Sequence, residues 1–227
     1  MLSYSDQKIC NDLFNINRSL AGKENRKSLR ILKNHIKDLK IKSFNSGEKI
    51  GDWIIPNEWN VTSAYIKDEN GNTLIDYKNN FLHLASYSSA FKGFVSSKYL
   101  KTKIYTSNKL NDAIPYKTFY YSNDWAFCIT KDQYKKLFDK KNKKFFVKID
   151  STFLKGKMNY GELYLKGKTK REIILSTYIC HPNLANNELF GQILAIKLIN
   201  EFKKTNLRYS MRFLFLPETI GSIAYLN

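Results

Sequence analysis

The strongest constraint on the fold is a strand–loop–helix–strand pattern in the last third of the chain. Residues 172–180, EIILSTYIC, form an apolar run typical of a strand that is covered on both faces. Apolar residues recur at helical spacing over 188–204, and 211–217, MRFLFLP, form a second apolar strand. Two strands joined through a helix imply a crossover and an at least partly parallel sheet. This region therefore predicts an α/β fold.

Changes in sequence character divide the 227 residues into three regions. Residues 1–48 are predicted to be helical, because apolar residues there recur at helical spacing between lysines. Residues 49–145 carry short β-rich runs, which predict an inserted all-β domain. Residues 146–227 return to strand and helix patterns, and are expected to form an α/β core that is incomplete at its C-terminus.

The strand prediction for the insert depends on turn signals between its runs. Asn70–Gly71 lies between two β-rich segments and predicts a hairpin. Further strands are expected at FLHLASYS (81–88), KTFYYS (117–122) and WAFCIT (125–130).

The formal net charge of +18 raises the question of nucleic-acid binding. Nearly all of the positive charge is lysine spread along the chain, with one dense run at 131–144. Arginine, the residue best suited to phosphate forks and base edges, is scarce. A solvated basic surface is therefore favoured, and no specific nucleic-acid partner is expected.

Cysteine usage and hydropathy indicate the compartment. Cys10, Cys128 and Cys180 are scattered, which fits a reducing environment rather than a disulfide framework. The first residues lack a signal-peptide pattern, and no stretch approaches the roughly 18 apolar residues that a membrane span needs. A cytoplasmic protein without membrane partners is expected. Cys180, beside His181, could be a nucleophile, but a small buried residue at a strand end is favoured.

Two residues at predicted strand ends could carry chemistry. His181 follows the first apolar strand, and the helix beginning near Glu188 would bring it close to oxygen ligands, as in a zinc site. From spacing alone, a structural histidine is the favoured alternative. Glu218 follows the second strand, where it could serve as a general base or as a carboxylate at a helix N-terminus. Spacing alone leaves these two roles equal.

The segments around these residues resemble a known family. HPNLANNELFG is similar to the zinc-exopeptidase loop that follows the first metal-binding histidine, and FLFLPETIGSIAYL is similar to the strand and loop that carry the catalytic glutamate. Further segments resemble a subgroup of aminopeptidase-like proteins encoded with surface-polysaccharide genes. They are LFNINRSLAGKENRKSLRILK, IPNEWNVTSAYIKDENG, LIDYKNNFLHLASYS, DAIPYKTFYYSNDWAFCIT and MNYGELYLKGKTKREIILSTYICHP.

The resemblance implies a zinc-aminopeptidase-like hydrolase that acts on peptide or amide bonds. Its fold would be a mixed, mostly parallel sheet flanked by helices, and its cofactor one or two zinc ions. By position, His181 matches the first metal ligand and Asn187 falls where the family has a metal-bridging aspartate. Glu218 matches the glutamate that activates water, and Thr219 stands where a second, metal-binding glutamate is usual.

Departures from the family pattern weaken the expected site. Asn187 offers a neutral oxygen in place of a carboxylate, and Glu188, which could supply that charge, is shifted by one position. Phe190 stands where a small serine is usual. The resemblance also implies an acidic ligand and a histidine after Asn227. Without them, the chain is expected to bind zinc weakly or not at all, and to be inactive by itself. The alternative is a non-catalytic or modifying protein of surface-polysaccharide biosynthesis with a degenerate hydrolase fold.

The β-rich insert carries many aromatic residues and His83. Such a set could line a substrate groove, with His83 as a possible substrate-binding residue, but the core of a small β domain is favoured.

Overall fold

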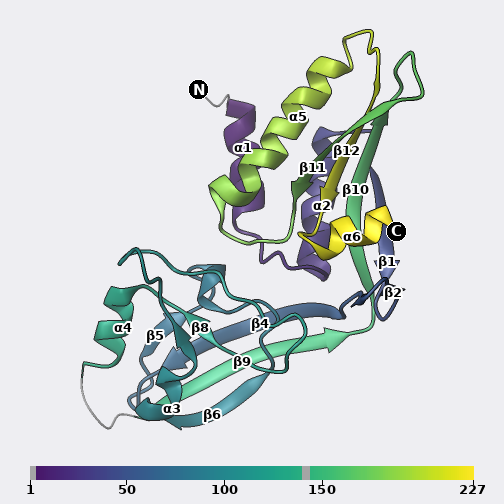
Figure 1. Cartoon of the computed structure of the whole chain (residues 1–227). Helices are drawn as coiled ribbons and strands as arrows, with labels where there is room; N and C mark the ends of the chain where they lie inside the picture. Colours follow the sequence, from purple (N-terminus) through teal and green to yellow (C-terminus); the bar gives the residue numbers. More distant parts are fainter. Residues whose placement is uncertain (1–3, 140–143) are drawn as a thin grey trace. The chain divides into compact units, whose positions relative to one another are not determined.

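The computed structural model describes residues 4–139 and 144–227, and they form two compact units (Figure 1). Unit 1 comprises Met1–Glu58 and Leu154–Asn227, and unit 2 comprises Trp59–Phe153. The sequence predicted the two boundaries of the β-rich insert at earlier positions, between residues 48 and 49 and between residues 145 and 146. They fall later because two long strands at the ends of the insert, β4 (Glu58–Lys67) and β9 (Lys144–Leu154), are neighbours in the sheet of unit 2.

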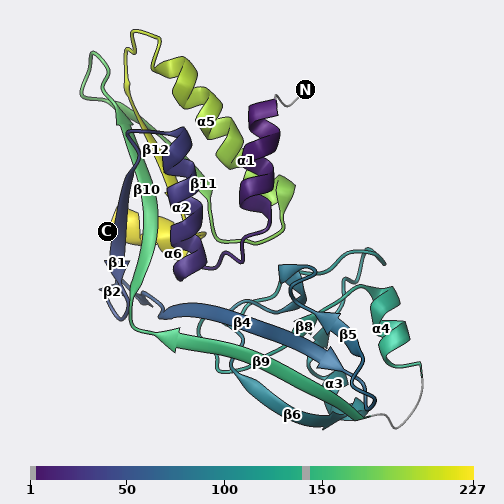
Figure 2. The same cartoon turned by 180° about the vertical axis from the view of Figure 1, so that it is seen from behind.

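Unit 1 contains a four-stranded mixed sheet (Figure 2). Its strands, in spatial order, are β1 (Lys40–Asn45), β10 (Lys157–Leu165), β12 (Ser210–Leu216) and β11 (Glu172–Tyr178). The pair β11–β12 is parallel, whereas β1–β10 and β10–β12 are antiparallel. The mixed α/β architecture is thus confirmed. The expectation of mostly parallel pairing is corrected for the described residues. The short connection 166–171 reverses the chain after β10, so β12, which runs parallel to β11, pairs with β10 in the antiparallel sense.

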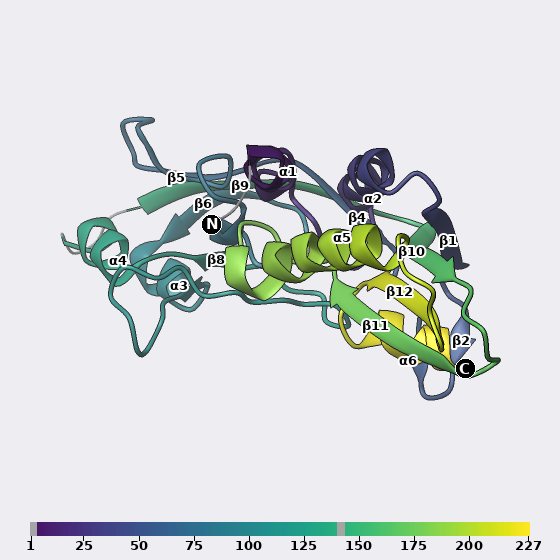
Figure 3. The same cartoon turned by 90° about the horizontal axis from the view of Figure 1, so that it is seen from above.

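Helices cover the two faces of this sheet unequally. The helices α1 (Tyr4–Phe14), α2 (Lys23–His35) and α5 (Phe190–Phe202) lie on one face, and α6 (Ile220–Leu226) lies on the other (Figure 3). The prediction of helices within 1–48 is confirmed for α1 and α2, but 40–45 is strand β1. None of the described helices is long and apolar enough to span a membrane.

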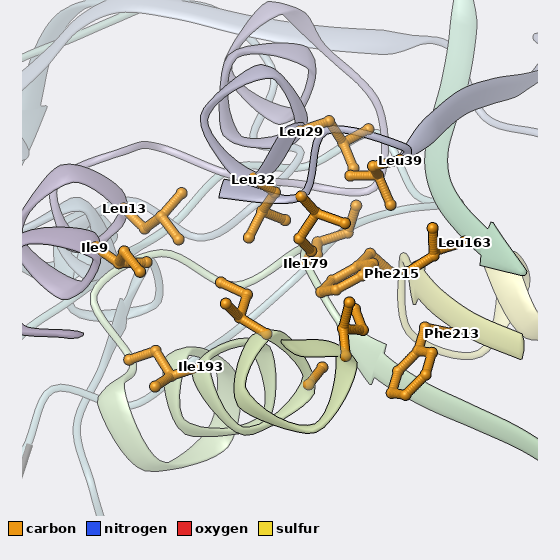
Figure 4. Packing of buried hydrophobic residues seen from close by; sticks show 14 of the residues in the cluster. Ile9, Leu13, Leu29, Leu32, Leu39, Leu163, Ile179, Ile193, Phe213 and Phe215 are labelled. Carbon is orange, nitrogen blue, oxygen red and sulfur yellow. The ribbon is translucent and has the colours of Figure 1, made fainter. Parts of the chain in front are cut away.

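The core of unit 1 fills the space between the sheet and the three helices (Figure 4). The cluster includes Leu29 and Leu32 of α2, Phe213 and Phe215 of β12, and Ile193 of α5. Full burial of such a side chain stabilises the fold by about 1.5–3 kcal/mol. The periodic apolar positions of α2 and α5 are therefore the residues that fix the helices on the sheet.

Strand β11 is less covered than its sequence predicts. It is the outermost strand of the sheet, and Ile173 and Ile174 are each 47% exposed. The prediction of a strand covered on both faces is therefore wrong for this chain, because among the described residues no strand lies beyond β11 and α5 reaches only part of its inner face.

Unit 2 is built on a second four-stranded sheet in the order β5 (Thr73–Asp76), β4, β9 and β6 (Phe91–Ser96). The hairpin predicted at Asn70–Gly71 joins β4 and β5. Gly71 adopts φ 86°, a region that favours glycine, and Asp68 Oδ1 accepts the backbone N–H groups of Asn70 and Asn72.

The other predicted strands of the insert are only partly confirmed. Residues 81–83 form a 3₁₀ turn because the Asn80 side chain accepts the N–H of Leu82, and 117–122 contributes only an isolated bridge at Thr118. Within 125–130, Phe127 and Cys128 form β8. The remaining short elements are β2 (Lys49–Ile50), β3 (Trp53–Ile54), α3 (Ser97–Lys101), β7 (Ile104–Tyr105) and α4 (Lys131–Leu137).

Some of the aromatic residues of the insert form its core. Trp59, Tyr87 and Trp125 are buried, and Tyr87 stacks on Trp59 with ring centroids 5.7 Å apart. Tyr121, in contrast, is exposed. The lysine-rich run 131–144 begins as α4 and extends through 140–143, which lie outside the described residues.

Candidate active site

The loop after β11 carries His181 and turns directly into a helix. Asn183 has φ 51°, a left-handed conformation that asparagine tolerates better than most residues, and it reverses the chain after Pro182. A π-helix, Ala185–Leu189, then leads into α5. Short π-helical turns occur frequently at functional sites, because they re-aim side chains that a regular helix would direct elsewhere.

Glu188 fixes this loop from inside. Its side chain is fully buried, and Oε1 accepts the backbone N–H groups of Cys180 at 2.9 Å and His181 at 2.8 Å. Its Oε2 accepts from Gln192 Nε2 at 3.0 Å. Both carboxylate oxygens are therefore engaged, and Glu188 acts as a structural anchor in this arrangement. The sequence suggested Glu188 only as a substitute metal ligand.

The His181 ring is oriented by acceptors on one side. Its Nδ1 lies 2.9 Å from Asn187 Oδ1 and 2.9 Å from Glu188 Oε1. Since both neighbours accept, Nδ1 carries a proton and donates on this side of the ring. Asn187, expected as a metal ligand, is therefore placed where it orients the ring, on the side away from Nε2.

Glu218 faces the Nε2 atom of His181. Its Oε2 lies 3.0 Å from His181 Nε2, although the two residues are far apart in sequence. The reason is topological: β11 and β12 are parallel neighbours, so their carboxyl ends meet at one edge of the sheet. The Glu218 side chain is 41% exposed whereas that of His181 is 4% exposed. The pair thus combines a buried, oriented imidazole with a carboxylate that solvent can reach.

Thr219, which follows Glu218, has a strained backbone. Its φ of 58° is rare for a β-branched residue, and its side chain is exposed. Such outliers cluster at functional sites. The strain lies at the N-terminus of α6, directly after the glutamate.

Cys180 contributes a neutral thiol. It is fully buried, and burial, followed by the nearby Glu188 carboxylate, raises the pKa of the thiol well above its ordinary value. Its Sγ accepts the backbone N–H of Glu218 at 3.1 Å and lies 3.9 Å from His181 Nε2. The thiolate that a nucleophile requires is therefore disfavoured. The geometry supports the interpretation of Cys180 as a buried structural residue.

Arg18 and Asn25 hold the strand end from the opposite side. Arg18 is fully buried, and its Nε and one terminal nitrogen donate to the His181 carbonyl at 3.1 and 2.8 Å. Asn25 donates to the Ile179 carbonyl at 2.9 Å. Sequence reasoning missed both residues, because no local pattern distinguishes them from surface polar residues of a helical region.

The side chains around His181 can be matched to the ligands that a catalytic zinc ion takes. His181 Nε2 and Glu218 Oε2 are close enough to bind one ion. Cys180, His181 and Glu188 also cluster, but Cys180 Sγ accepts the backbone N–H of Glu218 and the Glu188 oxygens are engaged. A catalytic zinc takes three protein ligands. The described residues thus offer two suitable donors, which is part of a zinc site.

His83, the possible substrate-binding residue, belongs to unit 2. It is 4% exposed, and its Nδ1 lies 2.8 Å from the Cys128 carbonyl, to which it donates. Burial lowers the pKa of this imidazole. This environment is that of a neutral histidine hydrogen-bonded within a core.

Comparison with known proteins connects this arrangement to a family. Residues 7–227 match the family described as a domain of unknown function, DUF4910. A protein of Clostridium acetobutylicum is 40% identical over 216 residues, which cover 95% of this chain and 49% of the relative. That protein is provisionally named a polysaccharide biosynthesis protein with an aminopeptidase-like domain. The chain therefore spans about half the length of this relative.

Solved structures give the same result for the fold. A crystal structure from Clostridium acetobutylicum, provisionally described as a peptidase, has a TM-score of 0.90 at 38% identity and covers 98% of this chain and 52% of its own. BSAP, a zinc aminopeptidase from Bacillus subtilis, has a TM-score of 0.60 at 12% identity and covers 100% of this chain and 65% of its own. The peptidase M28 precursor of Shewanella amazonensis also reaches 0.60, at 8% identity, over 97% of this chain and 65% of its own. The chain has an aminopeptidase-like fold and belongs to the DUF4910 family.

Proposed function

We propose that this chain supplies part of the active site of a zinc-dependent, aminopeptidase-like hydrolase that acts on peptide or amide bonds. The observation that carries the proposal is the 3.0 Å approach of Glu218 Oε2 to His181 Nε2 at the carboxyl ends of β11 and β12. The aminopeptidase-like fold supports it.

Each residue has a distinct role in this proposal. A bound zinc ion would polarise the substrate carbonyl and lower the pKa of a water molecule. His181 would hold the ion through Nε2, because Asn187 and Glu188 keep the proton on Nδ1. Glu218, whose side chain is partly open to solvent, would accept the proton of the water.

The chain by itself is proposed to be inactive. With Glu218 as the base, the described residues provide His181 Nε2 as the zinc donor, fewer than the three protein ligands that a catalytic zinc takes. Its relatives are about twice as long. The missing donors would have to come from the part of such proteins that has no counterpart in this chain.

A chimera tests the proposal directly. This chain would replace the matching half of the Clostridium acetobutylicum relative, and the chimera would be assayed with zinc and aminoacyl p-nitroanilides. Glu218→Gln is expected to lower turnover by about 10²–10⁴-fold, the usual contribution of a general base. Glu201→Gln, at a 70% exposed side chain, is the matched control. Equal turnover of the Glu218→Gln chimera and its parent would reject the assignment of Glu218.

A second function is a non-catalytic or modifying role in surface-polysaccharide biosynthesis. Two residues favour this function. The side-chain oxygen of Asn187 accepts from His181 Nδ1, and Thr219 has an exposed hydroxyl where a carboxylate was expected. The provisional name of the relative also mentions polysaccharide biosynthesis. This function predicts a folded chimera without zinc-dependent turnover of any aminoacyl substrate, whereas measurable turnover that depends on Glu218 excludes it.

A further inference from the structure

We propose that the open face of the unit 2 sheet binds a segment of an acidic polysaccharide. The centre of this face is a row of three aromatic rings from neighbouring strands, Tyr65 of β4, Phe146 of β9 and Phe94 of β6. We name this set the aromatic row. The proposal goes beyond both functions proposed above, because neither of them assigns a role to unit 2.

The two faces of this sheet have opposite characters. Ile66 of β4 and Phe145 and Val147 of β9 are buried, and they point into the core of unit 2. Because successive side chains of a strand point to opposite faces, Tyr65 and Phe146 lie on the other face of the sheet (Figure 2). The open face of an antiparallel pair such as β6–β9 usually carries polar residues. Contiguous rings at such a position are typical of a binding surface.

The aromatic row is continuous across the three strands. Phe94 pairs directly with Phe146 in the register of β6 and β9, and their ring centroids are 5.2 Å apart. The Tyr65 ring lies 6.4 Å from that of Phe146. Phe94 is 67% exposed, and the other two residues are half-buried. The row therefore offers ring surface to a flat apolar group, such as the C–H face of a sugar ring or the face of a nucleobase.

A pair of lysines lies next to the row on the same face. Lys92 of β6 and Lys148 of β9 are directly opposite each other, two positions along their strands from Phe94 and Phe146. Like charges at directly opposed positions destabilise a sheet. A shallow hollow of about 310 Å³ opens at this pair and is also lined by Asp150. An anionic group held in the hollow would offset the repulsion between the two ammonium groups.

The spacing of charges and rings suits a polymer that carries repeated carboxylates. Lys148 and Phe146 are two residues apart on β9, so their Cα atoms are about 7 Å apart. A carboxylate bound by the lysine pair would therefore place its own sugar ring beside the aromatic row. At the other end of the row, Lys144 pairs with Ser96, so a further cationic residue follows the rings.

Carboxylates on the face favour a sugar polymer over a nucleic acid. Asp150 lies 3.8 Å from Lys148 Nζ, and Asp76 of β5 is opposite Tyr65. These carboxylates would repel a continuous phosphate backbone, whereas they can accept hydrogen bonds from sugar hydroxyl groups. Arginine, the residue best suited to phosphate, is absent from the sequence 59–153. A second copy of the chain is disfavoured as the occupant, because it would bring lysines against lysines.

Calorimetric titration of the whole chain tests the proposal. The probes are an oligogalacturonate, whose sugars each carry a carboxylate, a neutral maltooligosaccharide of equal length, and oligothymidine as a single-stranded nucleic acid. We expect the oligogalacturonate to bind at least tenfold more tightly than either other probe. Phe94→Ala and Lys92→Glu should each weaken its binding at least tenfold. Tyr121→Ala and Lys109→Glu, at exposed residues between β7 and β8, are the matched controls and should leave it unchanged.

Several results would overturn the proposal. The first is an oligogalacturonate that does not bind, or that binds equally to the Phe94→Ala variant. The second is tighter binding of oligothymidine that Phe94→Ala weakens, since the face would then bind nucleic acid. The third is a dimer in light scattering that Phe94→Ala dissociates, since the occupant would then be a second copy.

Two further measurements keep the result independent of folding and of the zinc site. Circular dichroism reports the folding of each variant, and hydrogen exchange of residues 91–96 and 144–150 in the unmodified chain is expected to slow when the oligogalacturonate binds. The titration uses this chain alone and without zinc. Its outcome is therefore separate from the turnover of the chimera, which tests the functions proposed above.

Discussion

At the residue scale, the central feature is a histidine whose two nitrogens have different surroundings. Nδ1 faces Asn187 and Glu188, and Nε2 faces Glu218. The same loop is fixed by the buried groups of Glu188 and Arg18. The residues proposed to bind or react are therefore distinct from the residues that hold them in place.

Removing the Glu188 carboxylate should destabilise unit 1. Glu188→Ala leaves the N–H groups of Cys180 and His181 without their acceptor and leaves the buried Arg18 without a nearby negative charge. We expect a loss of about 3–5 kcal/mol in the free energy of unfolding, measured with urea and circular dichroism. Glu201→Ala, an exposed control, should change it by less than about 0.5 kcal/mol. A loss below about 1 kcal/mol at Glu188 would contradict its anchoring role.

Thiol labelling tests the assignment of Cys180 as structural. Burial raises the pKa of the Cys180 thiol well above its ordinary value and that of Cys128 to about 12, and both are inaccessible. Cys10 is only partly buried. In the folded chain at pH 8 we expect rapid labelling of Cys10 alone, which Cys10→Ala removes, and labelling of all three thiols after denaturation. Rapid labelling of Cys180 would indicate a reactive thiolate.

At the element scale, the sequence predicted which segments are strands and helices better than it predicted their neighbours. The apolar runs and helical spacing located β11, α5 and β12, and the position of His181 and Glu218 at strand ends followed from them. The sequence did not predict the contacts of Glu188 and Arg18, because these depend on chain segments that only the tertiary fold brings together. It also missed β1, whose short polar-rich segment resembles the end of a helix.

The β10–β11 connection depends on a close backbone approach at Gly167. A Cβ atom there would lie 2.4 Å from the Tyr209 carbonyl carbon and 2.6 Å from the Ser210 nitrogen, both main-chain atoms. Gly167→Ala is expected to lower the free energy of unfolding by about 1–3 kcal/mol. Gly93→Ala, where the added atom meets only the Phe91 ring at 3.8 Å, is the control and should change stability far less. Equal urea midpoints for the two variants would contradict this packing.

At the scale of the whole molecule, the basic charge is a property of the surface. The chain has 38 lysine and arginine residues against 20 acidic residues. Two charged groups near the site, Glu188 and Arg18, are paired internally and buried. We therefore expect the charge to contribute to solvation and to non-specific attraction rather than to a defined recognition site.

Filter binding tests this view of the charge. Any retention of DNA at about 50 mM salt should be equal for unrelated sequences and should be lost by about 200 mM salt, because it arises from counterion release alone. The comparison requires a duplex and a scrambled duplex of equal length. Binding that persists at the higher salt for only one of them would show specific recognition.

The most direct test of the central claim is the zinc content of the chimera that joins this chain to the unmatched part of the Clostridium acetobutylicum relative. After equilibrium dialysis, metal analysis should show bound zinc in the parent chimera. His181→Ala should remove at least one ion per chain, whereas His83→Ala should retain all of it, because His83 donates to a carbonyl within the core of unit 2. Equal zinc content in the His181→Ala chimera and its parent would contradict the claim that His181 belongs to a metal site.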